Sequence, residues 1–249
     1  MTVEIIDSKK KYKYGIKPKE MMAAGVHLGH RTSKLHPKME SFILGIRNTV
    51  HVFDLEKTAE YLEKALSFIE EMSKKGGTLL LIGTKVPLRS LVTQIAKDCG
   101  LPYVTERWLG GTFTNFEVIS KRAEYFKEME EKKEKGELEK YTKKERMKIE
   151  KELEDLRKKF EGIKDMKKIP EAVFICDIIK DKLALKEAKK KGVKVVAICD
   201  TNADPSLVDY PIPANDDAIS AVKYILEKVK EVIKKSKAQM SNTKANPND

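Results

Sequence analysis

The sequence predicts an α/β protein built on a mostly parallel, doubly wound sheet, and two observations support this prediction. First, residues 78–83 (TLLLIG), 172–176 (AVFIC) and 193–199 (VKVVAIC) are apolar runs of strand length, typical of strands buried on both faces. Second, segments with helical periodicity separate these runs, and Pro and Gly residues mark the boundaries. Strands that alternate with crossover helices imply helices on both faces of the sheet, which makes a three-layer domain.

The beginning of the chain lacks this alternation. Residues 9–19 (KKKYKYGIKPK) interleave lysines with two tyrosines and show no periodicity, so residues 1–16 are predicted to form a basic N-terminal arm. A short helix is expected over residues 19–24, ending at Gly25. Between residues 42 and 55 the runs FILGI and VHVFDL are rich in β-forming residues and are expected to be short strands.

The helices that separate the apolar runs have clear signals at their ends. Asp54 is expected to cap a long amphipathic helix that extends to Lys75, where Gly76-Gly77 ends it. Pro87 opens the next helix, and Gly100-Leu101-Pro102 closes it before a short strand, PYVT. Two more helices are expected in the second half of the chain, over residues 182–191 and 216–234.

Residues 116–166 differ sharply in composition and are dominated by Lys and Glu. Their sparse apolar residues recur at intervals of three and four, which predicts two helices packed as an antiparallel coiled-coil hairpin. The hairpin interrupts one discontinuous α/β domain formed by residues 17–115 and 167–235, and residues 236–249 are predicted to be a disordered tail. We interpret most lysines of the hairpin as a solvated face, with direct RNA contact as the alternative.

The composition favours a polyanionic partner. Lys and Arg (50) outnumber Asp and Glu (39), giving a formal charge of +11 and a pI near 9.3. Such an excess favours nucleic acid because neutralising phosphates releases condensed counterions, although a merely lysine-rich protein is the alternative. Three cysteines without CxxC spacing argue against a disulfide framework and a zinc knuckle. With no secretory signal and no long apolar run, a cytoplasmic protein is expected.

Motifs of enzymatic sites are missing from the sequence. No GxGxxG follows a strand, and IGTK after the 78–83 run lacks the spacing of a phosphate-binding loop. Asp177 and Asp200 directly follow buried runs, and we interpret them as helix-capping or turn residues, with ligand binding as the alternative. A zinc site is conceivable at His27 or His30 with Asp200 or Asp216, but turn histidines or phosphate contacts are favoured. The sequence therefore predicts no enzyme, cofactor or metal.

Several distinctive segments occur in a fixed order along the chain. They are GVHLGHRTSKLHPKM (25–39), IRNTVHVFDLEKT (46–58), IGTK, RWLGGTFTN (107–115), GIKDM (162–166), PEAVFICD, DTNADP and IPANDDAI (212–219). In this order, with a charged helical segment between RWLGG and GIKDM, the chain closely resembles the bacterial small-subunit ribosomal protein S-two family. The resemblance covers about residues 17–234, and one departure is His36, where the family commonly has Asn.

This resemblance implies a flavodoxin-like α/β domain with an inserted coiled-coil hairpin. It also implies a non-catalytic protein on the solvent side of the small subunit, between head and body. Proteins of the family bind small-subunit ribosomal RNA and neighbouring ribosomal proteins, and in bacteria they help to dock the large mRNA-binding protein S-one. The expected function is thus that of a structural constituent of the ribosome.

The candidate RNA-binding residues combine cations near turns with rings able to stack on bases. In RWLGGTFTN, a guanidinium and an indole accompany a Gly-Gly turn that permits close approach, although a buried Trp108 is an equally weighted alternative. The complete set of candidates is Lys9, Lys10, Lys11, Lys13, Tyr14, His30, Arg31, Lys34, Lys38, Arg47, Lys85, Arg89, Arg107, Trp108 and Asn115.

Two other classes of protein remain as alternatives. One is a flavodoxin-like enzyme or nucleotide-binding protein with a coiled-coil arm, which requires a phosphate cradle or a convergent acid–base set at the strand ends. The other is a scaffold that binds only proteins through the hairpin, for which the basic arm is unnecessary. Fold alone does not decide among them.

Overall fold

The computed structural model describes the backbone of residues 11–245 and the side chains of residues 11–239. Five parallel strands form its central sheet in the order β5-β4-β6-β7-β8. Numbered from the first strand of the sheet, this order is 2-1-3-4-5, which is the flavodoxin-like arrangement. The strands are β4 (Leu79–Ile82), β5 (Tyr103–Val104), β6 (Ala172–Ile175), β7 (Lys194–Cys199) and β8 (Tyr210–Pro213).

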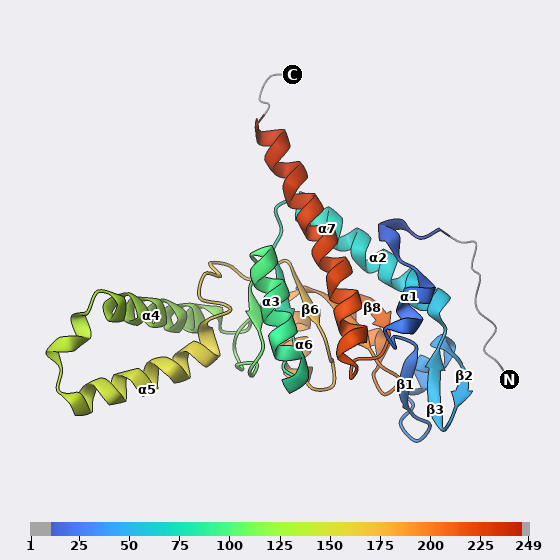
Figure 1. Cartoon of the computed structure of the whole chain (residues 1–249), viewed down its shortest axis with the longest axis horizontal. Coiled ribbons are helices and arrows are strands. Elements are labelled where there is room, and N and C mark those ends of the chain that lie inside the picture. The colour runs from blue at the N-terminus through green and yellow to red at the C-terminus, as the bar shows by residue number, and fades with distance from the viewer. Residues whose placement is uncertain (1–10, 246–249) are drawn as a thin grey trace.

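Helices cover both faces of this sheet, as the sequence predicts (Figure 1). One face packs against α2 (Leu55–Lys74), α3 (Arg89–Cys99) and α7 (Ile219–Ala245). The other face packs against α6 (Lys182–Lys191) and the base of the helical insertion. Successive strand residues alternate between the two cores, so both faces of each strand are apolar.

Helix α2 begins where the sequence predicts. The carboxylate of Asp54 accepts hydrogen bonds from the backbone amides of Glu56 and Lys57, at 3.0 and 3.4 Å. These bonds satisfy two amides that have no partner within the helix. The first helix, α1 (Pro18–Ala23), begins one residue before the expected stretch, with Pro18 in its first turn.

A second, antiparallel sheet lies beside the parallel one. Its strands are β1 (Leu28–Arg31), β2 (Ile43–Arg47) and β3 (Val50–Phe53), in the order β1-β3-β2. The runs FILGI and VHVFDL were expected as strands, but β1 and the separate sheet were not. The reason is that β1 contains Gly29 and His30 and its sequence lacks a strand pattern. It joins the sheet by pairing with β3.

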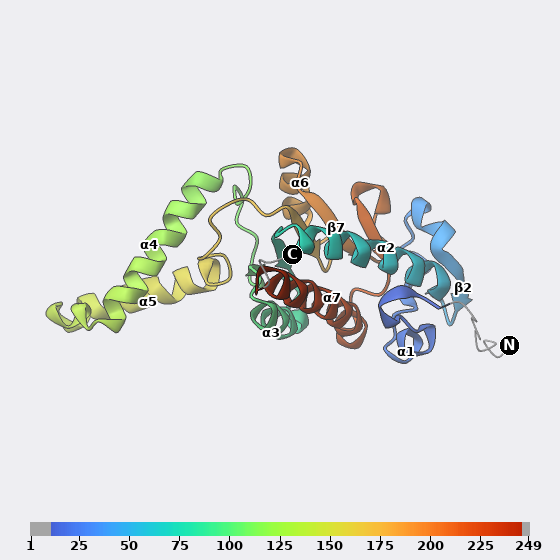
Figure 2. The same ribbon diagram turned by 90° about the horizontal axis from the view of Figure 1, so that it is seen from above.

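The charged insertion consists of α4 (Phe116–Glu134) and α5 (Lys143–Phe160), which project from the α/β domain (Figures 1 and 2). A capping box starts α5, with the Thr142 amide donating to Glu145 at 2.9 Å. Near the domain, Phe126 of α4 and Phe160 of α5 are buried in the core that they share with α6. Short 3-10 helices complete the fold: η1 (Lys13–Gly15), η2 (Pro37–Phe42), η3 (Val86–Leu88), η4 (Glu137–Lys140) and η5 (Pro205–Leu207).

The C-terminal part of the chain is helical farther than the sequence analysis expects. Helix α7 continues past Ser236 to Ala245, through residues expected to be a disordered tail. Lys, Ala, Gln and Met in this stretch are strong helix formers, which allows the helix to extend beyond its buried face. Within residues 11–245, no helix is both long and apolar enough to cross a membrane.

Candidate nucleic-acid interface

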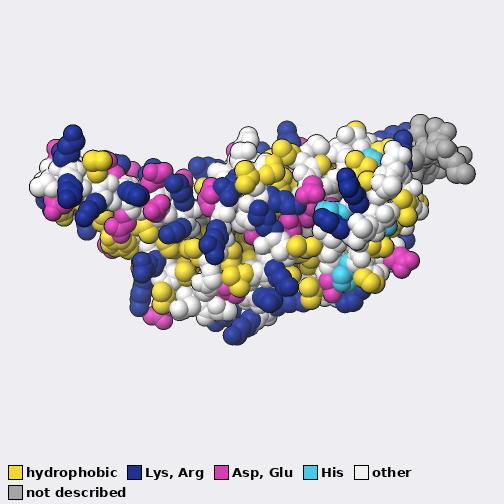
Figure 3. Space-filling view, turned by 90° about the horizontal axis from the view of Figure 1, so that it is seen from below, with side chains coloured by type: hydrophobic (Ala, Val, Ile, Leu, Met, Phe, Trp, Pro, Cys, Tyr) yellow, Lys and Arg dark blue, Asp and Glu magenta, His cyan; other side chains and the backbone are white. Residues whose placement is uncertain are grey.

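Four of the predicted RNA-binding residues line one groove of about 700 Å³. His30 and Arg31 come from β1, Lys34 from the turn after it, and Arg47 from the end of β2. The loops that follow β7 and β8 form the other wall, with Asp200, Asn215 and Asp217. Figure 3 shows His side chains among Lys, Arg, Asp and Glu in the half of the molecule away from the α4–α5 insertion. We call this cavity the hairpin groove, after the hairpin formed by β2 and β3, which lies away from the α4–α5 insertion.

A tight turn between β2 and β3 holds Arg47 at the rim of the hairpin groove. Asn48 and Thr49 have positive φ angles of 48° and 63°, and Arg47 pairs with Val50 across the turn. Two central residues with positive φ match the twist of a β-hairpin. The turn therefore directs the exposed Arg47 away from the sheet and into solvent.

Strand β1 lies very close to the loop after β7. The amide of His30 donates to Thr201 Oγ1 at 3.1 Å, and the amide of His36 donates to the Thr201 carbonyl at 2.8 Å. A Cβ atom at Gly29 would lie 2.5 Å from Thr201 Cγ2, so only glycine fits without displacing that side chain. These contacts join the antiparallel sheet to the carboxyl edge of the parallel sheet.

His30 forms an ionic clasp across this junction. Its Nδ1 lies 3.1 Å from Asp200 Oδ1, and its Nε2 lies 3.4 Å from Asp217 Oδ2. The hydrogen bond to Asp200 raises the pKa of His30 above its usual value despite partial burial, and Asp217 adds to the rise. Burial, together with Asp177 and Asp200, raises the pKa of Asp216 to about 7.

The His30 clasp predicts a pH-dependent stability. Because the folded pKa of His30 lies above the unfolded value of 6.5, its contribution is complete below pH 6.5 and is lost as pH rises through the folded pKa. Urea unfolding at pH 6 and pH 8.5 should show greater stability at pH 6, and His30→Gln should reduce the difference. Protonation of Asp216 also makes the folded chain more stable as pH falls below 7. The comparison with His30→Gln therefore separates the contribution of the histidine from that of Asp216. An equal pH dependence in both proteins would contradict the clasp.

Three cations of the hairpin groove are exposed and not ion-paired within the described residues. Arg31, Lys34 and Arg47 are exposed, and none forms an ion pair with another described residue. Lys38, also predicted to contact RNA, differs because its Nζ lies 3.0 Å from Asp204 Oδ2 and 2.6 Å from Ser206 Oγ. The groove thus carries three exposed cations, opposite a wall that includes Asp200 and Asp217.

Lys85 is held inside the protein. Its ammonium lies 3.0 Å from Asp177, 2.8 Å from Asp216 and 2.7 Å from Asp217. Although burial opposes it, the attraction of Asp216 and the neighbouring hydrogen bonds raise the pKa of Lys85. The predicted phosphate contact at Lys85 would therefore involve an ammonium that three carboxylates at the carboxyl edge of the sheet already neutralise. The same ion pairs occupy the place where flavodoxin-like proteins bind ligands.

The RWLGGTFTN segment is organised by a residue that the sequence analysis missed. Glu187 of α6 is buried, and its carboxylate accepts five hydrogen bonds from this segment. The donors are the Trp108 indole (3.3 Å), the amides of Gly111 (2.8 Å), Phe113 (3.0 Å) and Thr114 (3.1 Å), and the Thr114 hydroxyl (3.1 Å). A signal existed, because Glu187 falls on the same helical stripe as the buried Ala184 and Ala188.

The Glu187 network leaves Trp108 in the core. The indole is 5% exposed and contacts Phe113 edge to face at 4.9 Å. The ring is therefore not free to stack on a base, and the alternative of a core residue beneath a tight turn describes its position. Arg107 and Asn115 are exposed at either end of the segment, whereas Arg89 pairs with Glu106.

The described part of the basic arm packs on α2. Tyr14 donates to Glu70 Oε2 at 2.5 Å, and Lys13 Nζ lies 3.1 Å from the same oxygen. Both side chains are thus engaged by the α/β domain, while Lys11 remains exposed. Lys9 and Lys10 lie outside the described residues.

Of the residues weighed as a zinc site, His30 contacts Asp200, whereas His27 lies apart from them. His27 lines a separate cavity of about 170 Å³, and its buried Nδ1 has no hydrogen-bond partner among the described residues, while His30 is engaged by Asp200 and Asp217. Burial, with Arg47 nearby, lowers the pKa of His27. In the described part of the chain, no group of three or more His, Cys, Asp or Glu side chains is arranged to hold a metal ion.

The fold and the groove together define a class of protein. A basic α/β chain with ion pairs filling its carboxyl edge, and exposed cations beside an open groove, has the features of a structural protein with a polyanionic partner.

Comparison with known proteins makes the class specific. Residues 21–236 match the family described as ribosomal protein S2. The small ribosomal subunit protein uS2 of Coprothermobacter proteolyticus is 46% identical over 86% of this chain and 80% of its own length. The proteins of the same name from Dictyoglomus thermophilum and Dictyoglomus turgidum are each 43% identical, over 88% and 86% of this chain and 89% and 87% of their own lengths.

The chain belongs to the ribosomal protein S2 family. Proteins of this family are structural and not enzymatic, which confirms the prediction that the chain is not an enzyme. As a family member it is a ribonucleoprotein component of the small subunit in translation, and its place on cytoplasmic ribosomes agrees with the sequence prediction.

Proposed function

We propose that the hairpin groove binds small-subunit ribosomal RNA, with Arg31, Lys34 and Arg47 contacting phosphates. The observation that supports this most directly is that these exposed cations, from two separate segments, meet on one groove and form no ion pair with another described residue. Cations that are already exposed need break no ion pair to contact a phosphate. His30 acts as a positioning residue that holds β1 against the parallel sheet. Further contacts are proposed for Lys11, Arg107 and Asn115, which are exposed, and for Lys9 and Lys10.

Charge reversal in the hairpin groove tests this proposal. The double variant Arg31→Glu/Arg47→Glu should bind small-subunit ribosomal RNA roughly tenfold or more weakly near physiological salt. The slope of log K against log salt should fall by about 2, because two phosphate contacts are lost. Filter binding or fluorescence anisotropy across a salt series measures both quantities.

The matched control reverses two exposed cations elsewhere. Lys190→Glu/Lys191→Glu, at the end of α6, changes the net charge by the same amount outside the groove. If both double variants weaken binding equally, the effect reflects overall charge, and the groove is not the binding surface.

We also propose that the antiparallel sheet contacts a neighbouring ribosomal protein, with protein S-one as the expected partner. Strand β2 is at the edge of this sheet, and its Leu44 and Ile46 side chains are 59% and 64% exposed. An edge strand with apolar side chains facing solvent is suited to cover by a partner. The inserted helices are proposed to act as an antiparallel coiled-coil arm, which the Arg157–Glu130 pair at 2.8 Å stabilises.

Replacing the two exposed side chains of β2 with charged ones tests the partner surface. Leu44→Glu/Ile46→Glu should abolish co-sedimentation of protein S-one with reconstituted small subunits while leaving RNA binding intact, because buried unpaired carboxylates oppose an apolar interface. Val118→Glu, at an exposed apolar position of α4, is the control. Retention of protein S-one by the double variant would exclude β2 as its docking site.

A further inference from the structure

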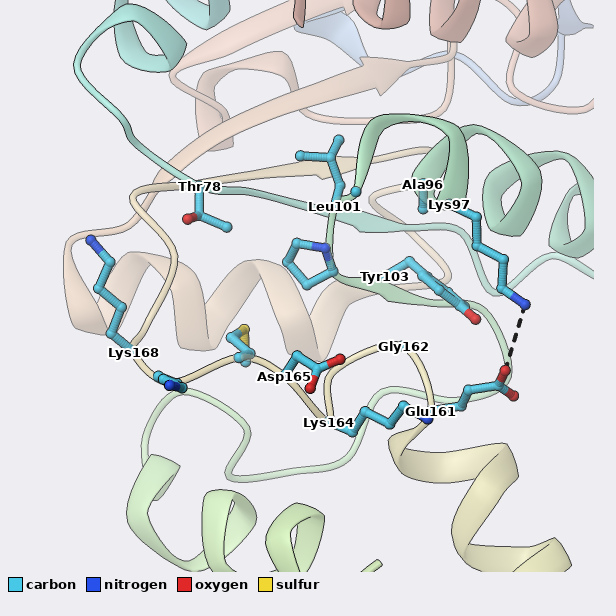
Figure 4. Close-up of a pocket in the computed structure, with 14 residues that line it drawn as sticks. Thr78, Ala96, Lys97, Leu101, Tyr103, Glu161, Gly162, Lys164, Asp165 and Lys168 are labelled. Carbon is cyan, nitrogen blue, oxygen red and sulfur yellow. Dashed lines mark ion pairs between the residues drawn. The ribbon is translucent and has the colours of Figure 1, made fainter. Parts of the chain in front are cut away.

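A second large cavity lies at the opposite edge of the parallel sheet, where β4 and β5 begin and α3 ends. Its volume is about 680 Å³, and Figure 4 shows it lying between β5, the end of α3 and the segment 161–168. Its lining includes the apolar side chains of Leu101, Pro102, Tyr103 and Met166. We call it the amino-edge pocket. A cavity of this volume accommodates a ligand the size of a nucleotide.

Lysines surround this pocket, and they differ in how firmly they are held. Lys167 is exposed and forms no ion pair with another described residue. Lys97 is 60% exposed and lies 3.5 Å from Glu161 Oε1, a distance beyond a good hydrogen bond (Figure 4). Lys168 and Lys164, by contrast, are paired with Glu171 at 2.5 Å and Glu130 at 3.0 Å. Lys167 and Lys97 are therefore the cations available to an incoming anion.

Tyr103 gives the pocket an aromatic wall. Its ring lies between the amino-edge pocket and an adjoining cavity of about 370 Å³, and in Figure 4 it points toward the Lys97–Glu161 pair. The Tyr103 hydroxyl donates to none of the described residues, so the phenol is not committed to an internal hydrogen bond. Burial, with Glu161 nearby, raises the pKa of Tyr103, which keeps the ring neutral. A neutral, partly exposed ring is a suitable surface for stacking a base.

We propose that the amino-edge pocket binds one unstacked nucleotide of RNA, with its base against Tyr103 and Pro102 and its phosphates beside Lys97 and Lys167. The combination of an aromatic wall and exposed lysines is what single-stranded nucleic acid requires. An acidic peptide would use the lysines but leave the aromatic and proline surfaces without a partner. This contact goes beyond the hairpin groove, because the two cavities lie at opposite edges of the sheet and share no lining residue. One chain would thereby join two segments of RNA.

Paired substitutions separate the role of the ring from that of the fold. Tyr103→Leu should weaken binding of a single-stranded RNA oligonucleotide about tenfold, whereas Tyr103→Phe should bind like the unaltered chain, because the ring alone stacks. Lys167→Glu should weaken binding and lower the salt slope by about 0.7, the value for one phosphate contact on a single strand. Lys190→Glu, outside both cavities, is the charge control. Equal affinity of Tyr103→Leu, Lys167→Glu and the unaltered chain would overturn the proposal. Binding of poly-glutamate at the same site in preference to RNA would also overturn it.

A second measurement is the cleavage of ribosomal RNA by a reagent tethered to the chain in the assembled particle. It requires that the labelled chain is folded and incorporated. The three native cysteines are buried, so a single new cysteine can carry an iron chelate that generates hydroxyl radicals. Lys168→Cys, at a lining position that the proposal does not use for binding, reports on the amino-edge pocket. Ser33→Cys, on the exposed turn beside Lys34, reports on the hairpin groove. Both labelled chains are reconstituted into small subunits, and ribosomal RNA cleavage is mapped.

The two tethers distinguish failure of this inference from failure of the proposed function. Cleavage from both positions, at different RNA segments, is the expected result. Cleavage from position 33 alone would overturn the amino-edge pocket and leave the groove proposal standing. Cleavage from position 168 alone would support the pocket and refute the groove. Absence of cleavage from both, in particles that contain the labelled chains, would refute both proposals.

Discussion

Glu187→Gln is expected to lower the free energy of unfolding by about 3 kcal/mol, although no charge on the surface changes. The Glu187 carboxylate is 6% exposed and accepts five hydrogen bonds from the segment between Trp108 and Thr114. Burial alone would raise its pKa, but the amides of this segment and the indole outweigh burial and hold the pKa below its usual value of 4.5. In a glutamine, an NH2 group replaces one carboxylate oxygen. This donor would face the backbone N–H donors and leave buried amides unpaired. Urea denaturation at neutral pH measures the loss.

The control for this prediction is the preceding residue of the same helix. Lys186 is exposed, so Lys186→Ala should change stability by less than about 0.5 kcal/mol. The carboxylate also predicts an acid limit, since its stabilisation is present above pH 4.5 and is lost as pH falls through the lower folded pKa. If Glu187→Gln unfolds at the same urea concentration as the unaltered chain, the carboxylate does not organise this segment.

The part of the fold that follows from local sequence was predictable. The apolar runs at residues 79–82 and 172–175 are strands because both faces of the sheet are covered, and Asp54 caps α2 because its side chain acts on the next turn. Strand β1 was not predictable in this way, because its glycine and histidine are explained only by contact with Thr201, 171 residues away in sequence from His30. Local patterns report local interactions, and β1 depends on a distant one.

The same distinction applies to the candidate site. Charge and turn position were sufficient to predict that Arg31, Lys34 and Arg47 are exposed cations, and the structure has them exposed on one groove, while their contact with RNA stays a prediction. They were insufficient for Lys85, whose three aspartate partners come from the loops after β6 and β8. Trp108 was ambiguous because an indole serves both as a core residue and as a stacking surface, and only the position of Glu187 shows which. Sequence therefore identifies which residues are able to bind, and folding decides which of them remain available.

Gly162→Ala is expected to lower the free energy of unfolding by about 3 kcal/mol, from steric overlap and a lost backbone hydrogen bond. A Cβ atom at this position would lie 2.0 Å from the Tyr103 carbonyl oxygen, a backbone atom that has no flexible end to move aside. The Tyr103 amide donates to the Gly162 carbonyl at 2.9 Å, so the same contact fixes the end of α5 against β5. Separating them would also disturb Phe160 and Ile163, which are buried beside this contact.

Two measurements test this contact directly, with a matched glycine as control. Hydrogen exchange at the Tyr103 amide should be slow in the unaltered chain and fast in Gly162→Ala, because that amide loses its acceptor. A Cβ atom at Gly45 would meet no other atom within 4 Å, and the φ angle of Gly45 lies outside the positive range that only glycine adopts readily. Gly45→Ala should therefore be nearly neutral in urea unfolding. Slow exchange at Tyr103 in Gly162→Ala would mean that the backbone accommodates a methyl group there. The base of the α4–α5 insertion would then be held by its apolar side chains, since Phe126, Leu156 and Phe160 belong to the same core.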